Sequence, residues 1–218
     1  MPTSDYRNAQ GERLPGTTTV IGGNLGWNKG PLMYWAWSQG KEGKNYRDTS
    51  QAAADAGTLA HYFAECDITG QVPDPARMNV PAEVLKKAEG AFGAYLSWKE
   101  MSRVRIVASE VALVSNQHQY GGTLDGIGQL GEKYCLIDFK TSNGTYADHL
   151  IQLAAYQHLW EENHPDQLLT GGFHLLRFGK EHGDFHHHFY PDLAPAFEAF
   201  LALRRLHDYK RILEKRAA

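Results

Sequence analysis

The residues with the clearest chemical potential are two aspartates and a lysine, Asp125, Asp138 and Lys140. They fall on two strand-like segments, 120–130 and 133–141, whose very short connection predicts an antiparallel hairpin. In such a hairpin Asp125 lies opposite Asp138 to within about one position. Because side chains alternate along a strand, Asp138 and Lys140 share one face of it. The hairpin is therefore expected to gather two carboxylates and one ammonium group.

Such a cluster has a defined chemistry. Neighbouring carboxylates repel each other unless a cation lies between them, and a hard divalent ion such as Mg²⁺ is the usual solution. A metal held in this way polarises a phosphoryl oxygen and generates hydroxide, while a nearby lysine orients the water. The alternative is a ladder of alternating charges on a half-buried strand, which a single Asp-x-Lys pattern does not exclude.

Two helix-like segments carry further candidates. His61 and Glu65 are four residues apart on the predicted helix over 50–68, so they share one of its faces. An imidazole and a carboxylate placed in this way could complete a metal shell. Gln152 and Tyr156 share a face of a later predicted helix, where each could hydrogen-bond a phosphate or a catalytic side chain. Taken singly, such a histidine or tyrosine is more often an interior residue.

The surrounding pattern predicts an α/β domain with a mixed sheet and helices on both faces. Helical periodicity covers 50–68, 83–101, 146–163 and a final segment from about 192, and a short helix opens after Pro31. Strand-like segments cover 103–115, 120–130, 133–141, 171–178 and 185–190. Residues 1–16 are polar and punctuated by Gly and Pro, which predicts a loosely held arm before a single domain over 17–218.

Composition bounds the class of function. The chain has 218 residues and a net charge of −3, so any binding to a polyanion requires a local basic patch or a bound cation. No apolar run approaches the roughly 20 residues that cross a bilayer, and the N-terminal residues lack the apolar core of a signal peptide. We therefore expect a cytoplasmic protein with no membrane partner.

Four motifs together resemble the RecB-type branch of the PD-(D/E)XK nuclease superfamily. They are Gly57…His61, Gly122-Thr-Leu-Asp125, Ile137-Asp138-Phe139-Lys140-Thr141 and Gln152-Leu-Ala-Ala-Tyr156, in the order of that family. The stretch over 17–43 also resembles the N-terminal region of phage-encoded members. The resemblance implies a restriction-endonuclease-like core and a metal-dependent deoxyribonuclease, with an exonuclease acting on DNA ends in phage recombination or repair as the favoured activity.

Two alternatives stay open at this point. One is a structure-specific or nicking endonuclease on the same core. The other is a non-catalytic DNA-binding module that retains the fold, although the intact Asp125, Asp138 and Lys140 argue against it. The expected partner is DNA, and a phage recombination protein or a second copy of the chain is a further candidate. A phage-encoded protein would act in the cytoplasm of the bacterial host.

The resemblance also assigns roles to the motif residues. It implies that His61, Asp125, Asp138 and the backbone carbonyl of Phe139 bind Mg²⁺ or Mn²⁺. Asp125, Asp138 and Lys140 form the catalytic set, in which Lys140 positions the attacking water.

Other residues support this set. Glu110 falls near the level of Asp125, where some relatives carry a glutamate, and it is a second-tier candidate ligand together with Glu65. Gln152, Tyr156 and Thr141 contact DNA or brace the site.

Two cofactor classes are excluded. The chain has two cysteines, too few for a four-cysteine iron–sulfur cluster. It also lacks a Gly-x-x-x-x-Gly-Lys-[Ser/Thr] loop, and the Gly-x-Gly-x-x-Gly pattern over 126–131 leads into a strand instead of a helix, so we expect no nucleotide cofactor.

The polyanion patch that the net charge requires has two candidate locations. Arg204 and Arg205 begin a basic run on the C-terminal helix, and Lys41, Lys44 and Arg47 cluster before the His61 helix.

Overall fold

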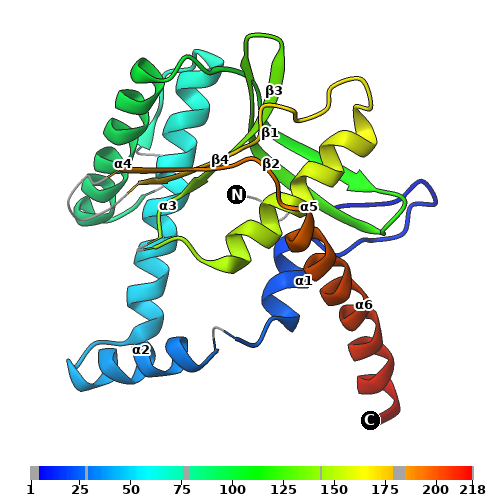
Figure 1. The fold of residues 1–218 in the computed structure, drawn as a ribbon. Helices are drawn as coiled ribbons and strands as arrows, with labels where there is room; N and C mark the ends of the chain where they lie inside the picture. Colours follow the sequence, from blue (N-terminus) through cyan, green and yellow to red (C-terminus); the bar gives the residue numbers. More distant parts are fainter. Residues whose placement is uncertain (1–4, 28, 76–78, 143, 179–184, 218) are drawn as a thin grey trace.

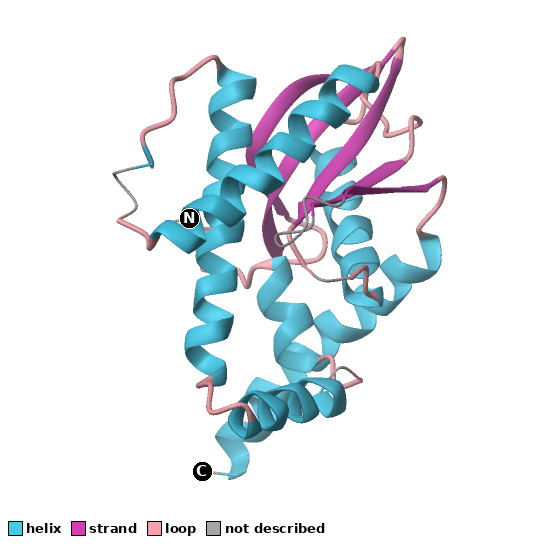
Figure 2. Ribbon diagram, turned by 90° about the vertical axis from the view of Figure 1, so that its left-hand side faces the viewer, coloured by secondary structure: helices cyan, strands magenta, loops and turns pink. Residues whose placement is uncertain are grey.

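The protein folds around a five-stranded mixed sheet with helices on both faces, as the sequence predicts (Figures 1 and 2). The computed structural model describes residues 5–27, 29–75, 79–142, 144–178 and 185–217. The helices are α1 (Thr17–Asn24), α2 (Lys29–Lys41), α3 (Tyr46–Thr69), α4 (Ala82–Met101), α5 (Ala147–Asn163) and α6 (Ala194–Ala217). The strands are β1 (Arg105–Ser115), β2 (Tyr120–Leu130), β3 (Lys133–Lys140), β4 (Phe173–Phe178) and β5 (Phe185–Tyr190). Within the described ranges, no helix is both long and apolar enough to cross a membrane.

The strands lie in chain order across the sheet, from β1 to β5. All neighbouring pairs are antiparallel except β3 and β4, which run parallel because α5 carries the chain back across one face. The hairpin of β2 and β3 has the predicted register, with Gly126 opposite Ile137 and Leu130 opposite Lys133. Continued by one position, this register sets Asp125 opposite Asp138.

Two apolar cores sandwich the sheet. One forms against α1, α5 and α6 and contains Leu136 of β3, whereas the other forms against α3 and α4 and contains Ile137 and Phe139. Alternation along β3 therefore turns Phe139 into the α3–α4 core, as predicted, and places Asp138 and Lys140 on the opposite face with α5.

Helix α3 carries one side of the candidate site, and both of its ends have a local cause. It begins at Tyr46 and not at the predicted Ser50, because the Asn45 side chain accepts a hydrogen bond from the Arg47 backbone N–H and caps the helix earlier. It ends where predicted, since Gly70 adopts the left-handed conformation (φ 71°) that favours glycine.

Helix α1 was not predicted. Its β-branched residues Thr17 to Ile21 have low helix propensity, but Val20 and Ile21 are buried in the core shared with α5 and α6. Tertiary burial decides the local structure here.

Residues 5–16 pack along the start of β2, in contrast to the loosely held arm expected for 1–16; residues 1–4 lie outside the described ranges. The Tyr6 hydroxyl lies 2.9 Å from Thr123 Oγ1, and the Gly121 backbone N–H donates to Pro15 O. A Cβ atom at Gly121 would lie 2.2 Å from Tyr6 Cγ, so the ring occupies the space that the glycine leaves. The segment covers β2 beyond the end of the shorter β3.

Candidate metal centre and groove

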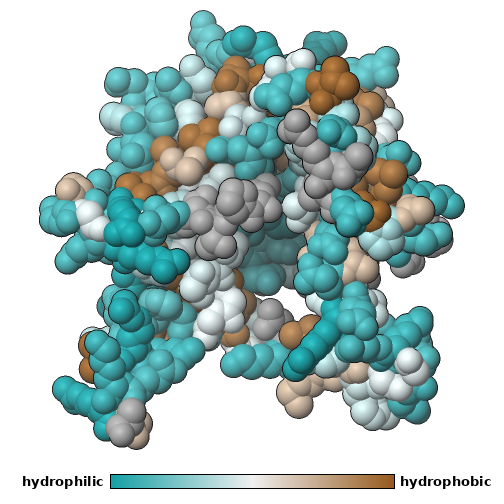
Figure 3. All heavy atoms as spheres, turned by 180° about the vertical axis from the view of Figure 1, so that it is seen from behind, coloured by the Kyte–Doolittle hydropathy of each residue, from teal (hydrophilic) through white to brown (hydrophobic). Residues whose placement is uncertain are grey.

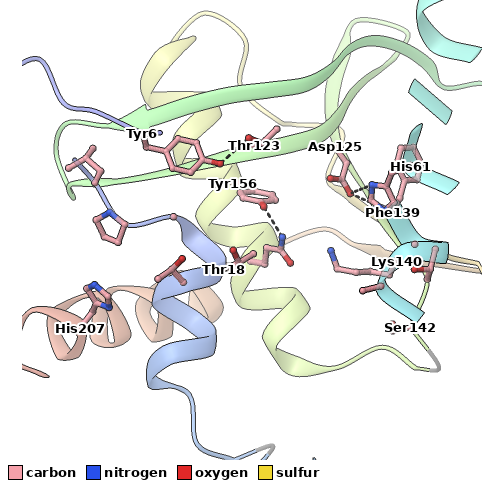
Figure 4. A pocket seen from close by; sticks show the side chains of 18 of the residues that line it. Tyr6, Thr18, His61, Thr123, Asp125, Phe139, Lys140, Ser142, Tyr156 and His207 are labelled. Carbon is pink, nitrogen blue, oxygen red and sulfur yellow. Dashed lines mark hydrogen bonds and ion pairs between the residues drawn. The ribbon is translucent and has the colours of Figure 1, made fainter. Parts of the chain in front are cut away.

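A groove of about 960 Å³ opens where β2 and β3 separate. Helix α3 contributes His61, the two strands contribute Asp125 and Lys140, and α5 contributes Gln152 and Tyr156 (Figure 4). The far wall consists of residues 13–16, Thr18 and Thr19, and of His207 and Arg211 on α6. The groove thus gathers residues from every motif of the predicted site.

Asp125 connects the two strands where they line the groove. The β2–β3 ladder ends at Gly126 and Ile137, and beyond it the Phe139 backbone N–H donates a hydrogen bond of 2.8 Å to Asp125 Oδ2. The carboxylate replaces the ladder bond that separation of the strands removes. Asp125 is thereby held at a fixed position, and its side chain lines the groove.

Three side chains could hold one cation. One donor atom each from His61, Glu110 and Asp125 lies within 4.8 Å of the others. His61 Nδ1 is 3.8 Å from Asp125 Oδ2, and its ring packs edge-on against Phe139 at 5.8 Å. His61 Nδ1 is buried and has no hydrogen-bond partner among the described residues. An unsatisfied ring nitrogen beside two carboxylates fits a divalent cation.

Glu110 takes its place in this cluster through an unusual backbone. It has φ 51°, a left-handed conformation that is costly for a residue with a Cβ atom. The flanking pairs, Ser109 with Gly126 and Val111 with Leu124, set Glu110 opposite Asp125. Burial, then the Asp125 and Glu65 carboxylates, raise the pKa of Glu110 to about 7. The second-tier candidate Glu110 therefore belongs to the cluster, whereas Glu65 lies outside it.

Asp138 and Lys140 form a buried ion pair next to this cluster. Asp138 Oδ2 contacts the Lys140 ammonium, and Asp138 is 0% exposed. Burial raises the pKa of Asp138 against the opposing effect of the Lys140 charge. Burial alone would lower the pKa of Lys140, but the Asp138 and Asp125 carboxylates outweigh it and leave the pKa above its usual value. Asp138 Oδ1 has no hydrogen-bond partner within the described part of the chain.

Helix α5 closes the floor of the groove. Gln152 Nε2 donates a hydrogen bond of 2.7 Å to the Tyr156 hydroxyl, and both side chains line the groove with Thr141 (Figure 4). A Cβ atom at Gly122 would lie 2.7 Å from Tyr156 Cε1, so the glycine in the Gly122…Asp125 motif allows this close packing. Burial, followed by the Asp125 and Asp138 charges, raises the pKa of Tyr156.

The basic residues on α6 separate into two groups. Arg204 is held in place by Asp208 at 2.6 Å and donates a further hydrogen bond to Gln119 O. Arg205 and Arg211 are both exposed, but Arg211 lines the groove together with His207, whereas Arg205 does not. Counting basic residues in the sequence could not distinguish these positions, because which face of α6 meets the groove depends on packing.

Sequence reasoning also missed the N-terminal part of the far wall. Arg13, Thr18 and Thr19 line it, beside Tyr6. The signal that could have found this wall is the absence of acidic residues from 13–41 in a chain with 25 of them.

Comparison with known proteins gives only distant structural likenesses. No family model matches the chain, and no curated protein matches it. A protein named SSO0001 is 17% identical with a TM-score of 0.35, and the match covers 63% of each chain. An alkaline exonuclease (LHK-Exo) from Laribacter hongkongensis is 14% identical with a TM-score of 0.37, covering 75% of this chain and 93% of that one. The structure of LHK-Exo in complex with dAMP is 16% identical in sequence with a TM-score of 0.32, and the match covers 77% of this chain and 92% of that one.

Proposed function

We propose that this chain is a metal-dependent deoxyribonuclease of the RecB-type PD-(D/E)XK family, an exonuclease acting on DNA ends in phage recombination or repair. The observation that carries the proposal is the cluster of His61, Glu110 and Asp125 beside the buried Asp138–Lys140 pair, with His61, Asp125 and Lys140 lining an open groove. The motif resemblance supports the family and the choice of an exonuclease over a nicking endonuclease.

The donor set fits Mg²⁺ or Mn²⁺. One imidazole and two carboxylates offer the nitrogen and oxygen ligands that these ions accept. His61, Glu110 and Asp125 would hold the ion, and the family resemblance adds Asp138 and the Phe139 carbonyl. When bound, a divalent ion polarises the phosphoryl group and lowers the pKa of a coordinated water.

The other side chains of the site have separate roles in positioning and charge stabilisation. The Lys140 ammonium, kept charged by Asp138, orients the attacking water and stabilises the charge that develops on the phosphate. The hydrogen bond from Phe139 to Asp125 fixes the position of β2 relative to β3. Gln152 positions the Tyr156 hydroxyl at the groove floor.

The groove must attract DNA although the chain has a net charge of −3. Arg211 and Arg13 place positive charge in its lining, where Arg13 also lies 3.4 Å from Asp5 Oδ1. The phosphate backbone would then lie between the basic walls and the metal-binding residues.

End-labelled linear DNA and circular DNA, each incubated with Mg²⁺, Mn²⁺ or EDTA, test the proposal. We expect cleavage of linear DNA with either ion and none in EDTA, and Lys140→Met should cleave about 10²–10³-fold more slowly with either ion. Undiminished cleavage in EDTA would contradict the metal dependence. Cleavage of closed circles at the linear rate would favour an endonuclease on the same core.

A further inference from the structure

Helix α2 is an exposed, strongly aromatic projection from the body of the protein. None of its residues is buried. Met33 is 72% exposed, Tyr34 69% and Trp37 56%. We call α2 together with residues 46–54 of α3 the aromatic arm; these α3 residues are also exposed or half-buried. Figure 1 shows the arm extending from the same side of the body as the C-terminal half of α6, and Figure 3 shows the two as separate lobes. Dense exposed apolar surface of this kind marks a binding site.

The exposed side chains of the arm are ordered. Tyr34, Trp37 and Lys41 recur at helical spacing on one face of α2. The rings of Tyr34 and Trp37 have centroids 5.5 Å apart, and Lys41 Nζ lies 4.7 Å from the Trp37 ring centroid. The half-buried Trp35 meets Tyr46 of α3 edge-on at 6.4 Å on another side. The arm therefore holds two adjacent rings and a cation open to solvent while a third ring anchors the helix.

The charge of the arm indicates which kind of partner would bind to the exposed rings. Helix α2 contains no Asp or Glu and has Lys29 and Lys41 at its two ends, and in residues 46–54 the single acidic residue, Asp48, follows Arg47, so the arm has a net positive charge. Glu42, which follows the helix, is paired with Lys44 at 2.8 Å. A symmetric contact with a second copy would bring the same positive face against itself. A polyanion with flat aromatic faces matches both features of the surface.

Helix α3 connects the arm to the candidate metal centre. Ala53, Ala54, Gly57 and His61 of this helix all line the groove, and their small side chains leave that face open. At 1.5 Å per residue, Tyr46 lies about 22 Å along the helix from His61. A strand bound at the arm can therefore follow α3 into the groove.

We propose that the aromatic arm binds single-stranded DNA, with bases stacked on Tyr34 and Trp37 and phosphates near Lys29 and Lys41. Unpaired bases offer free π-faces to such rings, whereas the bases of a duplex are already stacked on one another. The delivery of that strand to the metal centre rests on the proposed nuclease function; the binding itself does not.

Binding of a fluorescent oligothymidylate and of a blunt duplex, measured by anisotropy in EDTA, separates this proposal from cleavage. Loss of one stacked ring typically weakens binding about 10-fold, so the double variant Tyr34→Ala, Trp37→Ala should lose about 100-fold for the single strand and little for the duplex. Phe189→Ala removes an aromatic side chain of similar exposure (53%) on β5 and should change neither affinity.

Equal losses for single strand and duplex, or no loss for either, would overturn the proposal. So would a double variant that breaks up a wild-type oligomer in sedimentation experiments while keeping its affinity for oligothymidylate, because the arm would then be a self-association surface. Arm-dependent binding by a protein that cleaves no DNA with Mg²⁺ or Mn²⁺ would support the arm and contradict the nuclease.

Discussion

The carboxylate of Asp125, one residue beyond the last ladder pair of β2 and β3, accepts a hydrogen bond of 2.8 Å from the Phe139 backbone N–H, two residues beyond it. The same carboxylate oxygen lies 3.8 Å from His61 Nδ1. A group that belongs to the candidate metal cluster therefore also fastens the two strands that build it. Removing the charge and removing the hydrogen bond should have separable effects.

Two substitutions of Asp125 make that separation. Asp125→Asn keeps a carbonyl oxygen that can accept from Phe139, so we expect near-normal stability with weakened Mn²⁺ binding. Asp125→Ala loses both interactions and leaves a partly buried N–H unsatisfied, which should cost a further ~1–3 kcal/mol of unfolding free energy. Chemical denaturation and Mn²⁺ titration calorimetry measure the two effects. Equal unfolding free energies of the two variants would show that the hydrogen bond from Phe139 to Asp125 does not stabilise the fold.

Substitution of Lys140 should separate metal binding from turnover. Lys140 is not one of the three residues in the cation cluster, so Lys140→Met should keep its Mn²⁺ affinity. Loss of the charge that orients water should lower the cleavage rate by about 10²–10³-fold. Because the substitution leaves the Asp138 carboxylate buried without its cation, Asp138→Asn in the same chain should recover stability but not activity. Near-full activity of Lys140→Met would make the catalytic assignment wrong.

The hairpin was predictable because its determinants are local. A very short turn and period-two alternation set the register that places Asp125 opposite Asp138, and a left-handed glycine ends α3 at Gly70. These features depend on residues close together in sequence.

Other features depend on contacts that no local pattern encodes. Glu110 is a second-tier candidate in the sequence, yet it belongs to the cation cluster. Its own left-handed backbone conformation within β1 accompanies this placement, and no local sequence pattern of a strand predicts such a conformation. The sequence predicts Arg204 and Arg205 as the basic contacts of the C-terminal helix, but Arg211 is the arginine of α6 that lines the groove, because the packing of α6 decides which of its faces the groove meets. Helix α1 forms against its own propensity because Val20 and Ile21 are buried.

The backbone at Glu110 gives a prediction that links strain to function. Both Glu110→Gly and Glu110→Ala remove the candidate ligand and should weaken Mn²⁺ binding alike. Only glycine adopts φ 51° without cost, so Glu110→Gly should be more stable than Glu110→Ala by about 1–2 kcal/mol. Thermal unfolding of the metal-free proteins compares them. Should Ala prove as stable as Gly, the left-handed conformation of Glu110 would not be retained in solution.

A histidine pair between β4 and β5 should make the fold sensitive to acid. His174 Nδ1 lies 2.8 Å from His187 Nε2, and burial followed by the neighbouring ring lowers the pKa of His174. Burial also lowers the pKa of His187. A histidine in the unfolded chain has a pKa of about 6.5, so below that pH the unfolded state binds more protons. Stability should therefore be fully present above about pH 6.5 and fall as the pH decreases towards the folded-state pKa.

Urea denaturation at about pH 7.5 and about pH 5.5 tests this expectation, one condition on each side of the unfolded-state pKa. His187→Gln removes one titrating group and the neighbour of the other, so it should lose less stability on acidification than the wild type. His186→Gln, on the opposite face of β5, is the matched control. An unchanged acid sensitivity in His187→Gln would show that the pair does not govern it.

The last prediction concerns how the groove holds a polyanion. Arg211 lines the groove, whereas the likewise exposed Arg205 on the same helix does not, and Arg204 is paired with Asp208. Neutralising a phosphate contact on duplex DNA changes the slope of log affinity against log salt by about 0.9. We therefore expect Arg211→Gln to weaken duplex binding at low salt and to flatten that slope by about one contact, while Arg205→Gln leaves it unchanged. Measured in EDTA, the comparison does not depend on cleavage. If Arg205→Gln flattened the slope and Arg211→Gln did not, the DNA would follow the outer face of α6, and the groove wall would not contact phosphate.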